Sequence, residues 1–188
     1  MLILIGGISH SGKTLLAQKL LETHHYPYLS IDHLKMGLCR SGIACGFTPL
    51  DSTEHIAEKL WPMLKGIIMT AIENKQNLII EGAYLLPNRI AELDDEYQNE
   101  LLALYLCFSE SYIKAHLDSD ILRHRCAIES RKYGNSETLA DYLSESKRLK
   151  VLCEAHHATY FEISEDYQKE SSSIRTWIGE TIAKTSDI

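Results

Sequence analysis

A glycine-rich segment near the start of the chain, GGISHSGKT, carries residue types suited to binding a chain of phosphate groups. Four of its positions, Gly7, Gly12, Lys13 and Thr14, match the pattern G-x-x-x-x-G-K-[ST]. Glycines lack the Cβ atoms that would keep backbone N–H groups from surrounding a polyanion. The lysine supplies charge for the β- and γ-phosphates, and the hydroxyl group is suited to hold Mg²⁺. The spacing therefore predicts a loop that binds a nucleoside triphosphate.

The flanking sequence supports this interpretation over a chance glycine-rich turn. An apolar run, Met1–Ile5, precedes the loop and has the character of a strand buried on both faces. Leucines at helical spacing follow it from Thr14. Average composition produces this motif by accident in well under about 1% of chains of this length. The residues expected to contact the nucleotide in the loop are Gly7, Ile8, Ser9, His10, Ser11, Gly12, Lys13 and Thr14.

Asp32 is the first of two acids that are expected where strands end. It follows a short apolar run, Tyr28–Ile31, that predicts the second strand. In an open α/β sheet, ligands bind beyond the carboxyl ends of the strands, so this carboxylate is expected to face the phosphate loop. It would accept a proton from a substrate hydroxyl or bind Mg²⁺. The alternative is that Asp32 is only the N-cap of a short helix, and its neighbour His33 is a weaker candidate for the site.

Glu81 is the second acid, and it ends the predicted third strand, Asn77–Gly82. An apolar strand that ends in an acid is the general form of a strand that brings a carboxylate to a metal–nucleotide site. Glu81 is therefore expected to lie near Mg²⁺ and substrate. The alternative is a carboxylate that pairs with a basic residue at the rim of the sheet.

Basic residues gather in the segment RHRCAIESRK, at the end of a helix predicted over Ser111–Arg131. Arg123 and Arg131 are eight residues apart, so on a helix they share a face. Such arginines suit a lid over residues 109–135 that closes on the phosphates and neutralises charge during transfer. Arg123 is expected to act in catalysis, and both arginines are expected to bind the nucleotide. The alternative is an ordinary solvated helix face.

Residues 33–62 are predicted to form an insertion that binds the acceptor. The segment GLCRSGIACGFTP contains three glycines and a proline, which favours irregular structure. A helix is predicted from about residue 51 to residue 74, with a kink or restart at Pro62. Lys35 and Arg40 are candidates for holding an anionic acceptor, although ordinary surface charge explains them equally well.

The whole chain alternates between predicted strands and helices, which favours an α/β fold of the P-loop NTPase type. The five predicted strands are Met1–Ile5, Tyr28–Ile31, Asn77–Gly82, Leu101–Phe108 and Ala158–Ser164. They should form a mostly parallel sheet between helices. No linker or repeat divides the sequence, so residues 1–188 are expected to form one domain.

Composition narrows the class of protein further. The formal net charge of −7 argues against a non-specific nucleic-acid binder, which normally carries a basic surface. The five cysteines lack metal-site or disulfide spacing and indicate reduced thiols, with Cys107 as a buried small hydrophobe. No stretch has the roughly 18 apolar residues of a membrane-spanning helix. A cytoplasmic protein without membrane contact is therefore expected.

With these residues in place, the chain resembles the P-loop small-molecule kinases of the nucleoside-monophosphate-kinase-like group. The segments GGISHSGKT and IIEGAYLLP are most similar to those of 2-phosphoglycerate kinase-like and zeta-toxin-like proteins. The resemblance implies that Lys13 binds phosphate, Thr14 holds Mg²⁺, Asp32 lies beside the acceptor hydroxyl and Arg123 belongs to a lid. It also implies a nucleobase-contacting loop after the fifth strand. The insertion GLCRSGIACGFTPLD departs from the family's pattern and leaves the acceptor open.

These observations predict a phosphotransferase that uses ATP and Mg²⁺ to modify the hydroxyl or phosphate of a small metabolite. The main alternative is a nucleotide-dependent switch or regulatory ATPase without a small acceptor. A protein that binds a nucleotide but catalyses nothing is a second alternative. A toxin-like kinase of sugar nucleotides is a third possibility, within the enzyme class.

Overall fold

The computed structural model describes residues 1–124 and 137–186, and it contains one five-stranded sheet. The prediction of a mostly parallel sheet is confirmed, and all of its strand pairs are parallel. The strand order is β2-β3-β1-β4-β5. The strands are β1 (Leu2–Gly7), β2 (Tyr28–Ser30), β3 (Leu78–Glu81), β4 (Leu101–Phe108) and β5 (Thr159–Ile163).

The central strand β1 sets the position of the phosphate loop. All six of its residues are buried, as its continuous apolar sequence predicts. It lies between β3 and β4, with Ile5 opposite Glu81 and Gly7 opposite Leu106. Because these strands are parallel, their carboxyl ends meet at one edge of the sheet. The start of the loop and Glu81 therefore lie at the same edge.

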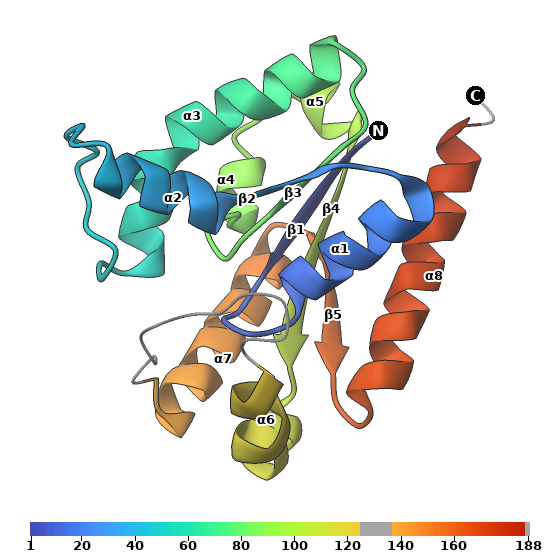
Figure 1. Cartoon of the computed structure of the whole chain (residues 1–188). Coiled ribbons are helices and arrows are strands. Elements are labelled where there is room, and N and C mark those ends of the chain that lie inside the picture. Colours follow the sequence, from blue (N-terminus) through green and yellow to red (C-terminus); the bar gives the residue numbers. More distant parts are fainter. Residues whose placement is uncertain (125–136, 187–188) are drawn as a thin grey trace.

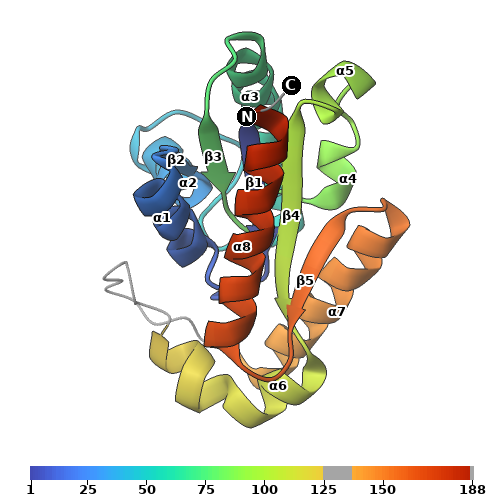
Figure 2. The ribbon, with the colours of Figure 1, turned by 90° about the vertical axis from the view of Figure 1, so that its right-hand side faces the viewer.

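Helices cover both faces of the sheet (Figure 1). On one face, α1 (Lys13–His24) and α8 (Tyr167–Ser186) pack their apolar residues against β1 and β4. Figure 2 shows α8 running across this face in front of the strands. On the other face lie α3 (Thr53–Glu73) and α7 (Leu139–Ala155). The remaining helical segments are α2 (Ile31–Arg40), α4 (Pro87–Ile90), α5 (Asp95–Gln98), α6 (Glu110–His116) and a π-helical turn, Leu117–Leu122.

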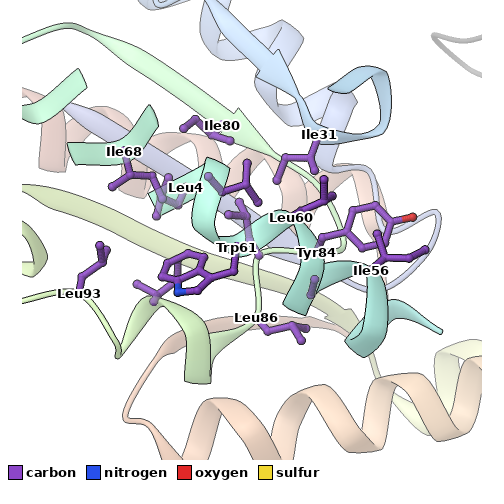
Figure 3. Packing of buried hydrophobic residues seen from close by; sticks show 14 of the residues in the cluster. Leu4, Ile31, Ile56, Leu60, Trp61, Ile68, Ile80, Tyr84, Leu86 and Leu93 are labelled. Carbon is purple, nitrogen blue, oxygen red and sulfur yellow. The ribbon is translucent and has the colours of Figure 1, made fainter. Parts of the chain in front are cut away.

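The long helix α3 is held by apolar packing against the central strands. Leu60, Trp61 and Ile68 of α3 belong to the same buried cluster as Leu4 and Ile80 of the sheet (Figure 3). Each fully buried side chain of this size contributes about 1.5–3 kcal/mol relative to exposure. This packing fixes the start of α3, which lies near the phosphate loop.

Three local predictions need correction. The second strand ends at Ser30, one residue earlier than predicted, because α2 begins at Ile31. Asp32 therefore lies in the first turn of α2 and is neither the end of the strand nor an N-cap. Of the segment predicted to be irregular, residues 37–40 are helical, while residues 41–49 lie outside helices and strands as predicted. Helix α3 continues through Pro62 without a restart.

The described thiols are free, and Cys107 and Cys153 are buried. Burial raises the pKa of each of these two thiols to about 12, which keeps them protonated and unreactive. The interpretation of Cys107 as a buried small hydrophobe is confirmed. Within the part of the chain that the structure describes, no helix is both long and apolar enough to cross a membrane.

Candidate phosphate-binding site

The loop between β1 and α1 has the backbone conformation that its glycines allow. Gly7, His10 and Gly12 have positive φ angles of 144°, 57° and 87°. A Cβ atom on Gly7 would lie 2.5 Å from the carbonyl oxygen of Leu106, and one on Gly12 would collide with the Tyr167 hydroxyl. Both glycines are therefore required by close approach as well as by backbone conformation.

Lys13 lies at the first position of α1 and is buried. Its Nζ atom donates a hydrogen bond of 2.6 Å to the carbonyl oxygen of Ile8, which closes the loop on itself. The Ser11 hydroxyl donates to the same oxygen at 2.9 Å. The amino-terminal end of α1, which attracts anions, follows directly. The charge of Lys13 and the amino-terminal end of α1 therefore both lie at the loop.

Glu81 lies beside this lysine at the end of β3, with only 2% of its surface exposed. Burial raises the pKa of its carboxyl group, while hydrogen bonding from Ser30 and Thr14 and the charge of Lys13 oppose the rise. Its Oε1 atom is buried and has no hydrogen-bond partner among the described residues. A buried carboxylate oxygen without a partner, next to a threonine hydroxyl, is suited to binding a cation.

Asp32 contributes a second carboxylate to the same edge of the sheet, and its charge acts on Glu81. Lys35, one turn further along α2, lies 3.1 Å from Asp32 Oδ1 and donates a 2.6 Å hydrogen bond to the Tyr84 hydroxyl. Burial lowers the pKa of Lys35, but Tyr84 and Asp32 outweigh it and raise the pKa above its ordinary value. Lys35 therefore stays charged and holds Asp32 in place.

Two further acids contact the loop, Glu145 on α7 and Glu137 just before this helix begins. The Ser9 N–H group donates a 3.1 Å hydrogen bond to Glu145 Oε1, and the Ser9 hydroxyl lies within 3.4 Å of the same atom. That hydroxyl also donates to Glu137 Oε1 at 3.3 Å. His10 joins the group through a 2.5 Å hydrogen bond with the Tyr142 hydroxyl. Here a carboxylate accepts a hydrogen bond from a backbone amide of the loop that is expected to bind phosphate.

Glu145 is a partly buried acid that lies near both Lys13 and Glu137. Burial raises the pKa of its carboxyl group, while the charge of Lys13 and the hydrogen bond from the Ser9 N–H group oppose the rise. The negative charge of Glu137 adds to the rise. The loop therefore binds an anionic group of its own chain in this structure.

A model of the family described as Zeta toxin matches residues 1–110, which is more than half of the 188 residues. The chain belongs to the zeta toxin family. This confirms the resemblance that its loop and third strand indicate. The match spans the loop, Asp32, Glu81 and the whole of β4. No curated protein matches this zeta toxin family member.

Solved structures with the same fold include three kinases. The structure is similar to a gluconokinase from Sinorhizobium meliloti 1021, with a TM-score of 0.55, 16% identity and coverage of 98% of this chain and 96% of that one. A deoxyadenosine kinase from M. mycoides has a TM-score of 0.52 and 14% identity, with coverage of 96% of this chain and 100% of that one. A shikimate kinase from Bacteroides thetaiotaomicron has a TM-score of 0.50 and 15% identity, with coverage of 95% of this chain and 98% of that one. At these identities the likeness shows a shared P-loop kinase fold.

The structure brings together only some of the residues that the sequence singles out in this zeta toxin family chain. Lys13, Thr14, Asp32 and Glu81 converge at one edge of the sheet, and Lys35 is tied to Asp32. Arg40 is exposed at the end of α2, and Arg123 is exposed after the π-helical turn, so their roles stay predictions. Arg131, like Arg125 and Lys132, lies outside the described residues. His33 is exposed on α2.

Sequence reasoning missed Glu145 and Tyr142 on α7, because no motif marks them. It also left the nucleobase side unassigned beyond the region near Ser164–Tyr167. There the structure has a narrow hollow lined by Gly12, Tyr167 and Arg175, between the start of α1 and α8.

The described residues contain no cluster of three or more histidine, cysteine, aspartate or glutamate side chains that would hold a metal by themselves. Magnesium bound with a nucleotide does not need such a cluster, since phosphates and water supply most of its ligands. The Thr14 hydroxyl and the unpartnered Glu81 Oε1 are the kinds of protein group that complete this shell. The residues therefore fit Mg²⁺ bound together with a nucleotide.

Proposed function

We propose that this protein is an ATP- and Mg²⁺-dependent phosphotransferase that acts on the hydroxyl or phosphate of a small metabolite. One observation carries the proposal. Lys13 and Glu81 are both buried beside Thr14 at the carboxyl edge of a parallel sheet, and Glu81 Oε1 has no hydrogen-bond partner among the described residues. A lysine and a carboxylate with a free oxygen are the groups that a magnesium–triphosphate complex needs.

In this proposal the backbone of residues 7–14 binds the triphosphate and Lys13 contacts its β- and γ-phosphates. Thr14 and Glu81 hold Mg²⁺, and Asp32 assists them directly or through water. When bound, the metal neutralises charge on the β- and γ-phosphates. Catalysis then depends on the chain's own groups for positioning and electrostatics.

Asp32 also faces the acceptor. It lies in the first turn of α2, partly exposed, and Lys35 fixes its carboxylate. We assign to Asp32 the orientation of the acceptor hydroxyl and the acceptance of its proton. Lys35 and Arg40 belong to the same helix and are assigned to acceptor binding. Arg123, together with Arg131 outside the described residues, is assigned to a lid over residues 109–135 that stabilises charge on the nucleotide.

The family and the fold support an acceptor that is a small molecule. Gluconokinase, deoxyadenosine kinase and shikimate kinase are named for small hydroxylated acceptors, and all three share this fold. Family membership adds sugar nucleotides to the candidates. A kinase of that kind should slow the growth of a host that expresses the active protein.

The proposal is tested by turnover. The purified protein is incubated with Mg²⁺-ATP and a panel of nucleosides, nucleoside monophosphates, sugars, sugar acids, phosphorylated glycerates and sugar nucleotides. ADP release and phosphorylated product are measured for each. We expect one class of acceptor to accelerate ADP release. GTP is tested in place of ATP in the same assay. ADP release that no acceptor accelerates would favour the regulatory ATPase instead.

Two variants check the assigned site. Lys13→Ala should lower nucleotide affinity at least tenfold, or about 1.4 kcal/mol. Lys19→Gln is the control, because Lys19 lies on the same helix and its exposed side chain pairs with Glu22 on the surface. A Lys13→Ala protein that binds ATP as tightly as the control would remove the lysine from the site.

A further inference from the structure

Tyr84 is a buried aromatic residue close to Asp32, and the proposed function gives it no role. It lies just after β3, three residues beyond Glu81. Its ring belongs to the buried cluster that contains Ile31 and Ile56 (Figure 3). The hydroxyl group of a buried tyrosine usually finds a hydrogen-bond partner. The partner of Tyr84 therefore shows what this residue does besides filling space.

The turn that carries Tyr84 packs directly against α2. A Cβ atom on Gly82 would lie 2.9 Å from the Cβ atom of Ile31, the first residue of α2. Because glycine has no such atom, the turn and the helix can approach this closely. The contact brings Tyr84 within reach of Lys35, about one turn along α2 from Ile31.

Tyr84 contacts the ammonium group of Lys35 in two ways. Lys35 Nζ donates a 2.6 Å hydrogen bond to the Tyr84 hydroxyl and lies 5.0 Å from the centre of the ring. The second distance is within the limit of about 6 Å for a cation–π interaction. The same Nζ atom lies 3.1 Å from Asp32 Oδ1. Tyr84 and Asp32 therefore hold one ammonium group between them.

Lys35 is more deeply buried than the acid that it pairs with. Its side chain is 11% exposed, whereas the side chain of Asp32 is 35% exposed. A buried charge needs partners that replace water. An ammonium group has three N–H donors, and the contacts with Asp32 and Tyr84 account for two of them. The charge of Lys35 is therefore directed at Asp32 and Tyr84 and not at the solvent.

A second carboxylate gives this contact its importance. The negative charge of Asp32 acts on Glu81 and opposes its ionisation. Lys35 supplies a positive charge that offsets this repulsion from the side of α2. A Lys35 side chain that could rotate freely would no longer hold the Asp32 carboxylate in one orientation. Misplacing a catalytic group by about 1 Å can lower the rate about 100-fold.

We propose that Tyr84 is a positioning residue for phosphoryl transfer. It holds the Lys35 ammonium group against Asp32, and Lys35 in turn fixes the carboxylate that orients the acceptor hydroxyl. This inference rests on the proposed function. Lys35 then contributes to the acceptor site through Asp32 and not through a contact of its own with an anionic group. Tyr84 itself touches neither the nucleotide nor the acceptor.

The kinetic test is Tyr84→Phe, which keeps the ring and removes the hydroxyl group. It uses the compound of the acceptor panel that is phosphorylated fastest. We expect kcat to fall about five- to tenfold, while the KM values for that compound and for ATP change less than about twofold. A kcat that does not fall, or a raised KM with unchanged kcat, would overturn the inference.

Tyr97→Phe is the matched control for the loss of a tyrosine hydroxyl group. Tyr97 donates a 2.8 Å hydrogen bond to Glu73, near the amino ends of β3 and β4 and thus at the opposite edge of the sheet from the site. Its kcat should stay within about twofold of the wild-type value. Equal losses of kcat in Tyr84→Phe and Tyr97→Phe would show that the effect does not come from the site.

Lys35→Met tests whether Tyr84 acts through Lys35. The substitution removes the ammonium group and keeps an unbranched side chain, so kcat should fall about 10- to 100-fold. Adding Tyr84→Phe to this variant should lower kcat less than about twofold further, because the hydroxyl group then has no ammonium group to hold. Equal effects of Tyr84→Phe with and without Lys35 would overturn the inference. Melting temperatures check that the variants fold.

A measurement on the wild-type protein tests the contact without any turnover. Nuclear magnetic resonance detects lysine ammonium groups whose hydrogens exchange slowly with water, and the signal missing from Lys35→Met is that of Lys35. Its exchange should be at least about tenfold slower than that of the exposed Lys19, and Tyr84→Phe should remove most of this difference. Equal exchange rates for Lys35 and Lys19 in the wild-type protein would overturn the inference.

Failure of this inference and failure of the proposed function have different signatures. If the protein phosphorylates an acceptor but Tyr84→Phe behaves like the Tyr97→Phe control, only the role of Tyr84 is wrong. If no acceptor accelerates ADP release, the phosphotransferase is wrong. The positioning role then falls with it, even where slow exchange at Lys35 shows that the contact with Tyr84 exists.

Discussion

Two acids beside the phosphate loop have the same chemistry but different surroundings. Glu81 ends β3 and is buried, and Glu145 lies on the inner face of α7 and is partly buried. Burial raises the pKa of both carboxyl groups, and the charge of Lys13 acts on both in the opposite direction. Glu81 Oε1 has no hydrogen-bond partner among the described residues, whereas Glu145 Oε1 accepts the Ser9 N–H group.

The two acids therefore differ in what a bound nucleotide would do to them. Glu81 has an oxygen available for a cation, whereas Glu145 occupies a loop amide that a phosphate group would need. Glu81 gains a partner when a cation arrives, since its buried oxygen has none within the described chain. Under the proposed function Glu145 loses its partner when a triphosphate binds, because the phosphate oxygens would take the same loop amide. The two acids should therefore respond in opposite directions when their charge is removed.

The largest effect is expected for Glu81→Gln. The substitution keeps the shape of the side chain but removes the charge, so affinity for Mg²⁺ in the presence of ATP should fall about 10- to 100-fold. The measurement is the Mg²⁺ dependence of nucleotide binding, followed by titration calorimetry. Glu154→Gln is the control, because Glu154 is exposed near the end of α7. An unchanged Mg²⁺ dependence would exclude Glu81 from the metal site.

A smaller effect of opposite sign is expected for Glu145→Gln. The neutral amide competes less well than a carboxylate for the Ser9 N–H group, so ATP affinity should rise about three- to tenfold, or roughly 1 kcal/mol. Fluorescence titration with a labelled ATP analogue measures this directly. A loss of affinity would mean that Glu145 assists the nucleotide, and the contrast between the two acids would then disappear.

The same contrast explains what could be predicted from the sequence. Glu81 could be predicted because an acid that ends an apolar strand of a parallel sheet lies at the carboxyl edge of that sheet, where ligands bind. Glu145 was missed because its position depends on how α7 is rotated against β4, and a helical pattern of mixed residues does not fix that rotation. The order of elements and the site on β1 and β3 follow from local patterns.

The errors in the fold have a similar cause. Asp32 was placed at a strand end because the apolar run continued to Ile31, but Ile31 is buried as the first residue of α2. The three glycines of residues 37–49 suggested an irregular chain, although Gly37 is accommodated within α2. In both places tertiary packing outweighed local propensity, which is worth only about 1 kcal/mol for a glycine in a helix.

Both acids should contribute to the pH dependence of the free energy of unfolding, with an effect smaller than those on ligand affinity. An acid whose pKa is raised in the folded state destabilises that state when it ionises, so its contribution is most favourable below the ordinary value of 4.5. The free energy of unfolding should therefore fall as pH rises from 4.5 through the raised pKa values. Glu145→Gln should reduce this slope. Denaturant unfolding between pH 4.5 and neutral measures it, and an unchanged slope would contradict the raised pKa of Glu145.

The smallest effect is expected at the ion pair between α3 and α7. Both Glu54 and Arg148 have more than 40% of their side-chain surface exposed, so water screens their attraction. Glu54→Gln should change the free energy of unfolding by less than about 1 kcal/mol. Arg148→Gln should have the same small effect, because it removes the same ion pair. Denaturant unfolding of both variants measures the change, and a loss well above about 1 kcal/mol in both would show that the pair is shielded from water.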